Sequence, residues 1–239
     1  MAETSSEAPV AFVCAMPMEL APLARRLGLR RAEVGGVPAR AGTLDGRPVV
    51  AVVTGMGTRL AAAGTARLLD AVTPHRVVVV GITGAVDDDT PIGAVIVPER
   101  VVDHATGREH EHRPLGPATP RGALWTTDVI TPAADLPALR ARGVVALDME
   151  TAAVALACEE RGVPWTVVRA VSDRATDGSV DDEVFHLSRP DGTPDLRAVA
   201  RYVARHPGRV PGLVRMARDA RLATHRAADA AVAAVRAAG

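Results

Sequence analysis

Residues 76–84 read RVVVVGITG, a run of four valines that ends in a turn with two glycines. A short, continuous β-branched run of this kind is typical of a strand that is buried on both faces, and we predict a strand at Arg76–Ile82. Comparable apolar runs predict further strands at Val10–Ala15, Val49–Val53, Gly93–Val102, Val144–Leu147 and Trp165–Val171.

Helical patterns alternate with these runs. The segments expected to be helical are the stretch that begins at Pro17, Leu60–Leu69, Glu150–Arg161 and most of Leu196–Ala238, with interruptions near Pro207 and Pro211. Alternating strands and helices predict an α/β fold, a three-layer sandwich with helices on both faces of a mixed, mainly parallel central sheet. Ligands of such sheets bind beyond the carboxyl ends of the strands, so the strand ends are where we look for functional residues.

At 239 residues the chain is long enough for one large domain with a substantial core. We expect residues 1–9 to form a disordered leader and residues 10–239 to form a single domain. The segments His104–Pro120 and Arg174–Pro194 are rich in polar residues, Gly or Pro, and we expect an exposed loop and a mobile loop there.

Composition argues against several classes of partner. The net charge is zero and aromatic residues make up 2% of the chain, so neither a polyanion nor stacked nucleic-acid bases are expected as ligands. The first residues do not resemble a signal peptide, and no window has the length and hydropathy of a membrane span. Cys14 and Cys158 both have apolar neighbours, which favours buried, reduced thiols in a cytoplasmic protein.

Three carboxylates follow predicted strands: Glu19, Glu150 and Asp173. Taken singly, each has a structural explanation, because carboxylates stabilise the first turn of a helix and also cap turns. Together, at one end of one sheet, they could converge on a pocket. One would then activate water, one would hold ribose hydroxyls and one would protonate a leaving base, which requires a raised pKa.

A second polar group, between Asp103 and His112, includes three histidines and two glutamates. Its spacing lacks the second ligand pair of a zinc site, so a solvated loop is the favoured interpretation. We therefore expect neither a metal nor a cofactor.

Five short segments resemble, in order, the motifs of the nucleoside phosphorylase/hydrolase superfamily. They are AMPMEL at 15–20, TGMG at 54–57, GITGA at 81–85, LDMETA at 147–152 and VRAVSD at 168–173. The fourth and fifth are the specific ones. Within that superfamily the opening motif is similar to that of methylthioadenosine/S-adenosylhomocysteine nucleosidases.

The resemblance implies cleavage of the N-glycosidic bond of a purine nucleoside, most simply an adenine nucleoside with a variable 5′ substituent. Glu19 would be the base that activates water, and Met149 and Glu150 would contact the ribose. Asp173 would protonate purine N7 with support from Ser172. Gly84, Ile130 and Thr131 would also contact the substrate. Because no Arg follows the strand that ends at Gly84, water is favoured over phosphate as the acceptor.

Two departures keep alternatives open. Ile130 occupies the position where these nucleosidases have a Phe that stacks on adenine, and Leu187–Gly208 is similar to hopanoid-associated phosphorylases. A phosphate-dependent phosphorylase, an adenosylhopanoid-cleaving enzyme and a catalytically inactive nucleoside-binding protein are the alternatives. The resemblance also implies a homo-oligomer, with a dimer as the expected form.

Overall fold

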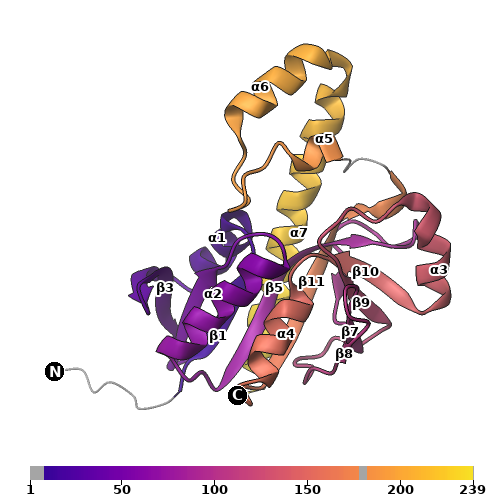
Figure 1. The fold of residues 1–239 in the computed structure, drawn as a ribbon. Coiled ribbons are helices and arrows are strands. Elements are labelled where there is room, and N and C mark those ends of the chain that lie inside the picture. The colour runs from indigo at the N-terminus through magenta and orange to yellow at the C-terminus, as the bar shows by residue number, and fades with distance from the viewer. Residues whose placement is uncertain (1–7, 178–181, 239) are drawn as a thin grey trace.

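The computed structural model describes residues 8–177 and 182–238, so most of the predicted leader lies outside the described residues (Figure 1). The strands are β1 (Val10–Cys14), β2 (Arg30–Val34), β3 (Val37–Leu44), β4 (Arg47–Val53), β5 (Arg76–Ala85), β6 (Val95–Ile96), β7 (Arg100–Asp103), β8 (Glu109–His110), β9 (Ala123–Thr126), β10 (Val144–Asp148) and β11 (Trp165–Arg174). The helices are α1 (Pro17–Arg26), α2 (Thr58–Ala71), α3 (Leu136–Ala141), α4 (Thr151–Glu159), α5 (Asp182–Phe185), α6 (Leu196–Arg205) and α7 (Val210–Ala237).

One mixed sheet joins these strands in the order β2-β3-β4-β1-β5-β10-β9-β7-β8, and β11 pairs with both β5 and β6. Strands β4, β1, β5 and β11 are linked by parallel pairing, as are β7, β9 and β10. The antiparallel pairs include the hairpins of β2, β3 and β4, and the contact of β10 with β5. The predicted α/β class with a mixed sheet and flanking helices is confirmed.

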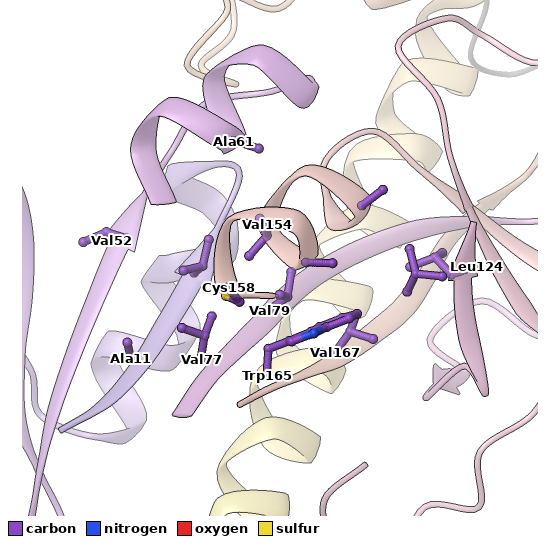
Figure 2. Packing of buried hydrophobic residues seen from close by; sticks show 14 of the residues in the cluster. Ala11, Val52, Ala61, Val77, Val79, Leu124, Val154, Cys158, Trp165 and Val167 are labelled. Atoms are coloured by element: carbon purple, nitrogen blue, oxygen red, sulfur yellow. The ribbon is translucent and has the colours of Figure 1, made fainter. Parts of the chain in front are cut away.

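Helices cover both faces of the central strands, because alternate strand residues point to opposite sides. In β1, Ala11 and Val13 pack with α2 and α4, while Val10 and Phe12 pack with α1 and α7. Figure 2 shows the first of these layers, in which Val77, Val79 and Val167 of the strands meet Val154 and Cys158 of α4. The predicted three-layer arrangement follows from this alternation.

A third, smaller cluster lies under α3, away from the central strands. Trp125 of β9 packs there with Leu136 and Leu139 of α3 and with Val102 of β7. This part of the sheet carries the residues that border the site from the side opposite β1.

Two local predictions were wrong, and one strand was missed. The strand expected at Gly93–Val102 is two short strands, β6 and β7, separated by a segment that contains Pro98, which cannot donate a ladder hydrogen bond. Strand β9 was not predicted. The loop expected at His104–Pro120 contains β8, and its His110 and His112 are buried. The interruption expected near Pro207 and Pro211 is present, because α6 ends at Arg205 and α7 begins at Val210. Pro211 itself lies in the first turn of α7, where a missing N–H costs little.

The segment expected to be a mobile loop, Arg174–Pro194, includes helix α5, and residues 178–181 within it lie outside the described part of the chain. Helix α6 and the first half of α7 extend away from the sheet (Figure 1). Among residues 8–177 and 182–238, no helix is both long and apolar enough to cross a membrane.

Candidate active site

A cavity of about 260 Å³ opens beyond the carboxyl ends of β5, β10 and β11. The structure brings all the site residues predicted from the sequence to its wall: Glu19, Gly84, Ile130, Thr131, Met149, Glu150, Ser172 and Asp173. The cavity is therefore where the rule for parallel strands places a ligand.

Glu19 lies in the first turn of α1 and is fully buried. Its Oε2 accepts hydrogen bonds from the N–H groups of Ala15 (2.8 Å) and Met16 (2.9 Å), and its Oε1 accepts one from Ile82 (2.9 Å). The carboxylate therefore interacts with the start of a helix and also lines the cavity.

Gly81 lets Glu19 come this close to the sheet. A Cβ at Gly81 would lie 2.3 Å from Oε1 of Glu19 and 2.4 Å from Nη1 of Arg169, so a side chain there would displace both charged groups. Burial raises the pKa of Glu19, although Arg169 and the three N–H groups oppose the shift. A carboxylate with a raised pKa is a better proton acceptor from water than an ordinary surface carboxylate.

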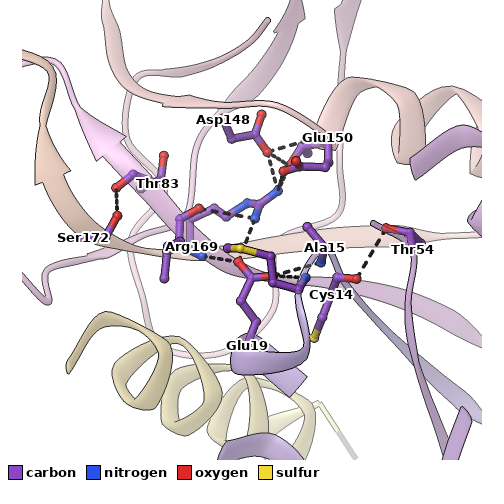
Figure 3. Close-up of polar contacts among 12 residues, drawn as sticks. Cys14, Ala15, Glu19, Thr54, Thr83, Asp148, Glu150, Arg169 and Ser172 are labelled. Carbon is purple, nitrogen blue, oxygen red and sulfur yellow. Dashed lines mark hydrogen bonds and ion pairs between the residues drawn. The ribbon is translucent and has the colours of Figure 1, made fainter. Parts of the chain in front are cut away.

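Arg169 of β11 is the buried cation that balances this end of the sheet (Figure 3). Its Nη2 donates to Asp148 and to Thr151 Oγ1 (2.8 Å), and it lies 3.6 Å from Glu150 Oε2. Its Nη1 lies 3.9 Å from Glu19 Oε1. One guanidinium thus faces three carboxylates, and the cluster has an excess of negative charge if all three are ionised.

Asp148 is held on both oxygens. Its Oδ1 accepts from Thr126 Oγ1 at 2.6 Å, and its Oδ2 accepts from the N–H of Thr151 at 3.1 Å and from Arg169. These bonds tie β9, β10, α4 and β11 together beneath the cavity. The guanidinium of Arg169 is consequently fixed in position, which is what a preorganised site requires.

Glu150 stands between the cluster and the cavity. Its Oε1 accepts from the N–H of Gly57 at 2.9 Å, which leaves Oε2 facing Arg169. Burial raises the pKa of Glu150, with a further contribution from Asp148, whereas Arg169 lowers it. Donors on a ligand, such as sugar hydroxyls, would stabilise the ionised form.

Asp173 lies at the other end of the cavity, where β11 ends beside Gly84. Ser172 Oγ lies 2.6 Å from Asp173 Oδ1. Burial raises the pKa of Asp173, the Ser172 hydroxyl lowers it, and the charge of Asp177 raises it. An acid that keeps its proton toward neutral pH can donate it to a leaving group.

The side wall between these groups is apolar. Ile130, Met149 and Leu147 face the cavity, and Thr131 stands at the rim beside Ile130. A flat, mostly apolar ring fits such a wall, with Asp173 available to one of its nitrogens. No group of three metal-binding side chains occurs in the described part of the chain.

Four residues were given no role from the sequence: Thr126, Asp148, Thr151 and Arg169. A usable signal was present for Arg169, because a charged residue inside the apolar run Trp165–Val171 must find buried partners. Asp148 precedes Glu150 by two residues, but nothing in the sequence indicates that it contacts Arg169 of β11. The strand β9 that carries Thr126 was itself missed.

The histidines of the discounted polar group have structural partners. His110 Nδ1 lies 2.9 Å from Glu159 Oε1 at the end of α4, and His112 contacts the carbonyl of Pro98. Both side chains are buried rather than solvated, so the expectation of a fully exposed loop was wrong.

Comparison with known proteins matches this chain to one family. The model of the phosphorylase superfamily matches residues 9–123 and 108–205. A 5′-methylthioadenosine/S-adenosylhomocysteine nucleosidase of Geobacillus kaustophilus is 30% identical over 71% of this chain and 86% of its own length. The enzyme of that name from Chromohalobacter salexigens is 29% identical over 70% of this chain and 84% of its own length.

Solved structures show the same fold. The nucleosidase of that name from S. pneumoniae with a transition-state inhibitor has a TM-score of 0.71 at 21% identity, covering 97% of this chain and 100% of its own. A futalosine hydrolase of Helicobacter pylori has a TM-score of 0.72 at 16% identity, covering 96% and 97%. The chain belongs to the phosphorylase superfamily.

Proposed function

We propose that this protein hydrolyses the N-glycosidic bond of adenine nucleosides, with water as the acceptor. The observation that carries the choice of water is the position of Glu19. The N–H groups of Ala15, Met16 and Ile82 are donors that could bind an anion at the strand ends, and the Glu19 carboxylate already accepts from all three. A phosphate at this place would have to displace a buried carboxylate or be repelled by it.

The chemistry follows from the two ends of the cavity. Glu19 accepts a proton from water as the water oxygen bonds to the anomeric carbon of the sugar. The bond from that carbon to purine N9 breaks with its electron pair going to the base, and Asp173 donates a proton to N7. Glu19 then holds the proton taken from water, and Asp173 is ionised because its proton has left on the base. Proton exchange with solvent restores both groups.

Positive charge develops on the sugar in such a reaction, and the described cluster is suited to stabilise it. Glu150 accepts hydrogen bonds from the sugar hydroxyls, and Arg169 keeps the surrounding carboxylates in place without touching the sugar. Met149 and Ile130 form the apolar wall against the sugar and the base. The names of the relatives support adenine nucleosides with 5′-thioether substituents as substrates.

We also propose a cytoplasmic homodimer. The two cysteines are free and buried, which suits a reducing compartment. A groove of about 810 Å³ is lined by small side chains of α2 and α4 and by the exposed Val129 and Leu156, with Arg59 and Asp128 at the side that it shares with a neighbouring cavity. Its apolar part suits a second protein surface. Sedimentation of the purified protein would measure the mass directly.

Each of the three alternatives has a specific test. A phosphorylase would release base only when phosphate is present, and an inactive binder would bind nucleosides without releasing base. An adenosylhopanoid-cleaving enzyme would act on the lipid conjugate and not on small nucleosides. The first experiment measures release of the free base from adenosine, inosine, methylthioadenosine and S-adenosylhomocysteine, with and without phosphate.

We expect phosphate-independent release from the adenine nucleosides. In Glu19→Gln we expect the rate to fall by about 10²–10⁴, the usual contribution of a general base, with nucleoside binding retained. Glu33→Gln, on the exposed strand β2, is the matched control for the same chemical change. Release that requires phosphate would overturn the assignment of water.

A further inference from the structure

A second cavity, of about 560 Å³, adjoins the candidate active site. The two cavities share Met56 and Met149 in their walls, and the second shares no residue with the Asp173 end of the first. Met149 immediately precedes Glu150, the proposed contact of the sugar hydroxyls. A nucleoside held with its base at Asp173 and its sugar at Glu150 would therefore extend its 5′ substituent toward the second cavity.

Two guanidiniums belong to the wall of this second cavity, Arg59 from the first turn of α2 and Arg189 from the turn that precedes α6. Within residues 8–177 and 182–238, neither side chain donates a hydrogen bond or lies within 4.0 Å of a carboxylate. The carboxylates near them, in contrast, do accept hydrogen bonds.

Each neighbouring carboxylate already has donors. Asp128, also in the wall, accepts from the N–H of Thr58 at 2.8 Å and from the Thr58 hydroxyl. Asp191 accepts from the N–H of Thr193 at 3.0 Å, and Asp195 accepts from the N–H groups of the first turn of α6. Hydrogen bonds lower the pKa of Asp191 and of Asp195, and the charge of Arg189 adds a smaller contribution to both. The hydrogen-bond donors of the two guanidiniums remain available for a ligand.

The turn that carries Arg189 is seated firmly against the mouth of the site. The N–H of Met56 donates to the carbonyl of Pro190 at 2.9 Å, and the N–H of Arg189 donates to the carbonyl of Thr193 at 2.8 Å. Gly192 packs directly on Met16, since a Cβ there would lie 2.2 Å from Met16 Cγ. The backbone of Arg189 is thus tied to residues that line the reaction cavity.

We propose that Arg59 and Arg189 form a subsite for an anionic 5′ substituent, a carboxylate or a phosphate, so that nucleosides with such a substituent are preferred over their neutral counterparts. The inference rests on the proposed function, because it takes the sugar and base to occupy the first cavity. A third cavity, which shares His186 with the second, is lined by Arg201 and Arg205 of α6 together with Glu183.

The effect expected is modest, because both guanidiniums are exposed and water screens their charge. We expect about a tenfold preference for the anionic ligand, which corresponds to about 1.4 kcal/mol. Salt should weaken the preference, since charges at the surface are screened over about 10 Å at 0.1 M salt.

The test compares ligands that differ by one anionic group. The neutral member is methylthioadenosine, and the carboxylate member is 5′-deoxy-5′-(carboxymethylthio)adenosine. These two ligands form the carboxylate arm of the test. Adenosine 5′-monophosphate and its neutral partner adenosine form the phosphate arm, so the two arms show which anion is preferred. The measured quantity is the ratio of kcat/KM for the anionic ligand to kcat/KM for its neutral partner.

In the double variant Arg59→Met with Arg189→Met, we expect this ratio to fall about tenfold in at least one arm. Arg67→Met, an exposed arginine two turns further along α2, should leave the ratio unchanged. The inference is overturned if the double variant keeps the ratio of the parent in both arms, or if the parent prefers the neutral ligand in both.

Binding measured by calorimetry separates this inference from the proposed function. If no nucleoside releases its base, the proposed function fails, and the affinities of the same ligand pairs still decide the inference. Tighter binding of an anionic member that is lost in the double variant, and weakened by salt, supports the subsite. Equal affinities in the parent and the double variant contradict it.

Discussion

The two ends of the central strands are built in opposite ways. Toward their amino ends, β1, β5 and β11 carry buried apolar side chains, most of them valine, which pack between helices on both faces. At the carboxyl ends, Glu19, Asp148, Glu150 and Arg169 are buried together. The first region is stabilised by removing apolar surface from water, whereas the second must offset the desolvation of several charges. A fold retains such a costly cluster where function needs it, and the predictions below test that contrast.

The largest effect is expected from Arg169→Met, which leaves three buried carboxylates without their cation. Removal of one partner of a buried ion pair costs about 3–5 kcal/mol, because the remaining charge is uncompensated. Chemical denaturation measures the loss of unfolding free energy. Arg236→Met is the control, since Arg236 pairs with Asp45 at the surface and should cost at most about 1 kcal/mol. Equal losses in the two variants would show that the cluster is not the energetically exceptional region.

Asp173→Asn is expected to separate catalysis from stability. The amide cannot donate a proton to the leaving purine, so the rate of base release should fall by about 10²–10⁴. The melting temperature should change little, because Ser172 can still hydrogen-bond the amide. A variant with near-normal turnover would remove Asp173 from the mechanism, and one that fails to fold would assign it a structural role instead.

Glu150→Gln should stabilise the ligand-free protein. Burial raises the pKa of Glu150 from 4.5 to about 8, so the folded state favours the protonated form. The stability associated with that proton is present below the unfolded pKa and is lost as the pH rises through the folded pKa. The glutamine of the variant does not titrate, so the variant keeps its stability as the pH rises. The difference in unfolding free energy between the variant and the parent should therefore grow between about pH 4.5 and 8, to roughly 1–2 kcal/mol. Thermal melts across this range measure the difference.

The contrary outcome for Glu150→Gln is also informative. A variant less stable than the parent across the whole range would mean that the ionised carboxylate is a net stabiliser beside Arg169. Glu160→Gln, at the exposed end of α4, supplies the control for the same change outside the cluster.

The smallest effect is expected from Ser172→Ala. The Ser172 hydroxyl lowers the pKa of Asp173, so its removal should raise that pKa further. Because the proposed role of Asp173 requires its protonated form, activity should be lost as the pH rises through its pKa. The alkaline limb of the activity profile should therefore move upward, by less than about one pH unit. The acid limb, which reports deprotonation of Glu19, should stay in place, and a downward shift of the alkaline limb would contradict the account.

The same contrast explains what could be predicted from the sequence. Continuous valine runs identify β1, β4, β5 and β11, because a buried strand needs little beyond apolar, β-branched residues. Short elements escaped this reasoning. Strand β9 has four residues and no distinctive pattern. Strands β6 and β7 were predicted as one strand, although Pro98 between them cannot donate a ladder hydrogen bond. In each case, pairing with distant strands decides the structure.

For the site, the carboxylates and their convergence could be predicted, since strand ends gather at one edge of a sheet. The partnership of Arg169 with Asp148 could not, because it depends on which strands neighbour one another. The antiparallel contact of β10 with β5 brings them together, and no local signal specifies that contact. Nor could the occupation of the Ile82 N–H by Glu19 be foreseen, although it now carries the choice of acceptor.

The most direct test of the central claim is the identity of the sugar product formed in phosphate buffer made with heavy-oxygen water. The account predicts that adenine release from methylthioadenosine yields a free sugar that carries the labelled oxygen at its anomeric carbon, at a rate independent of phosphate. A sugar 1-phosphate as the product would contradict it, and would mean that Glu19 yields its place to an anion.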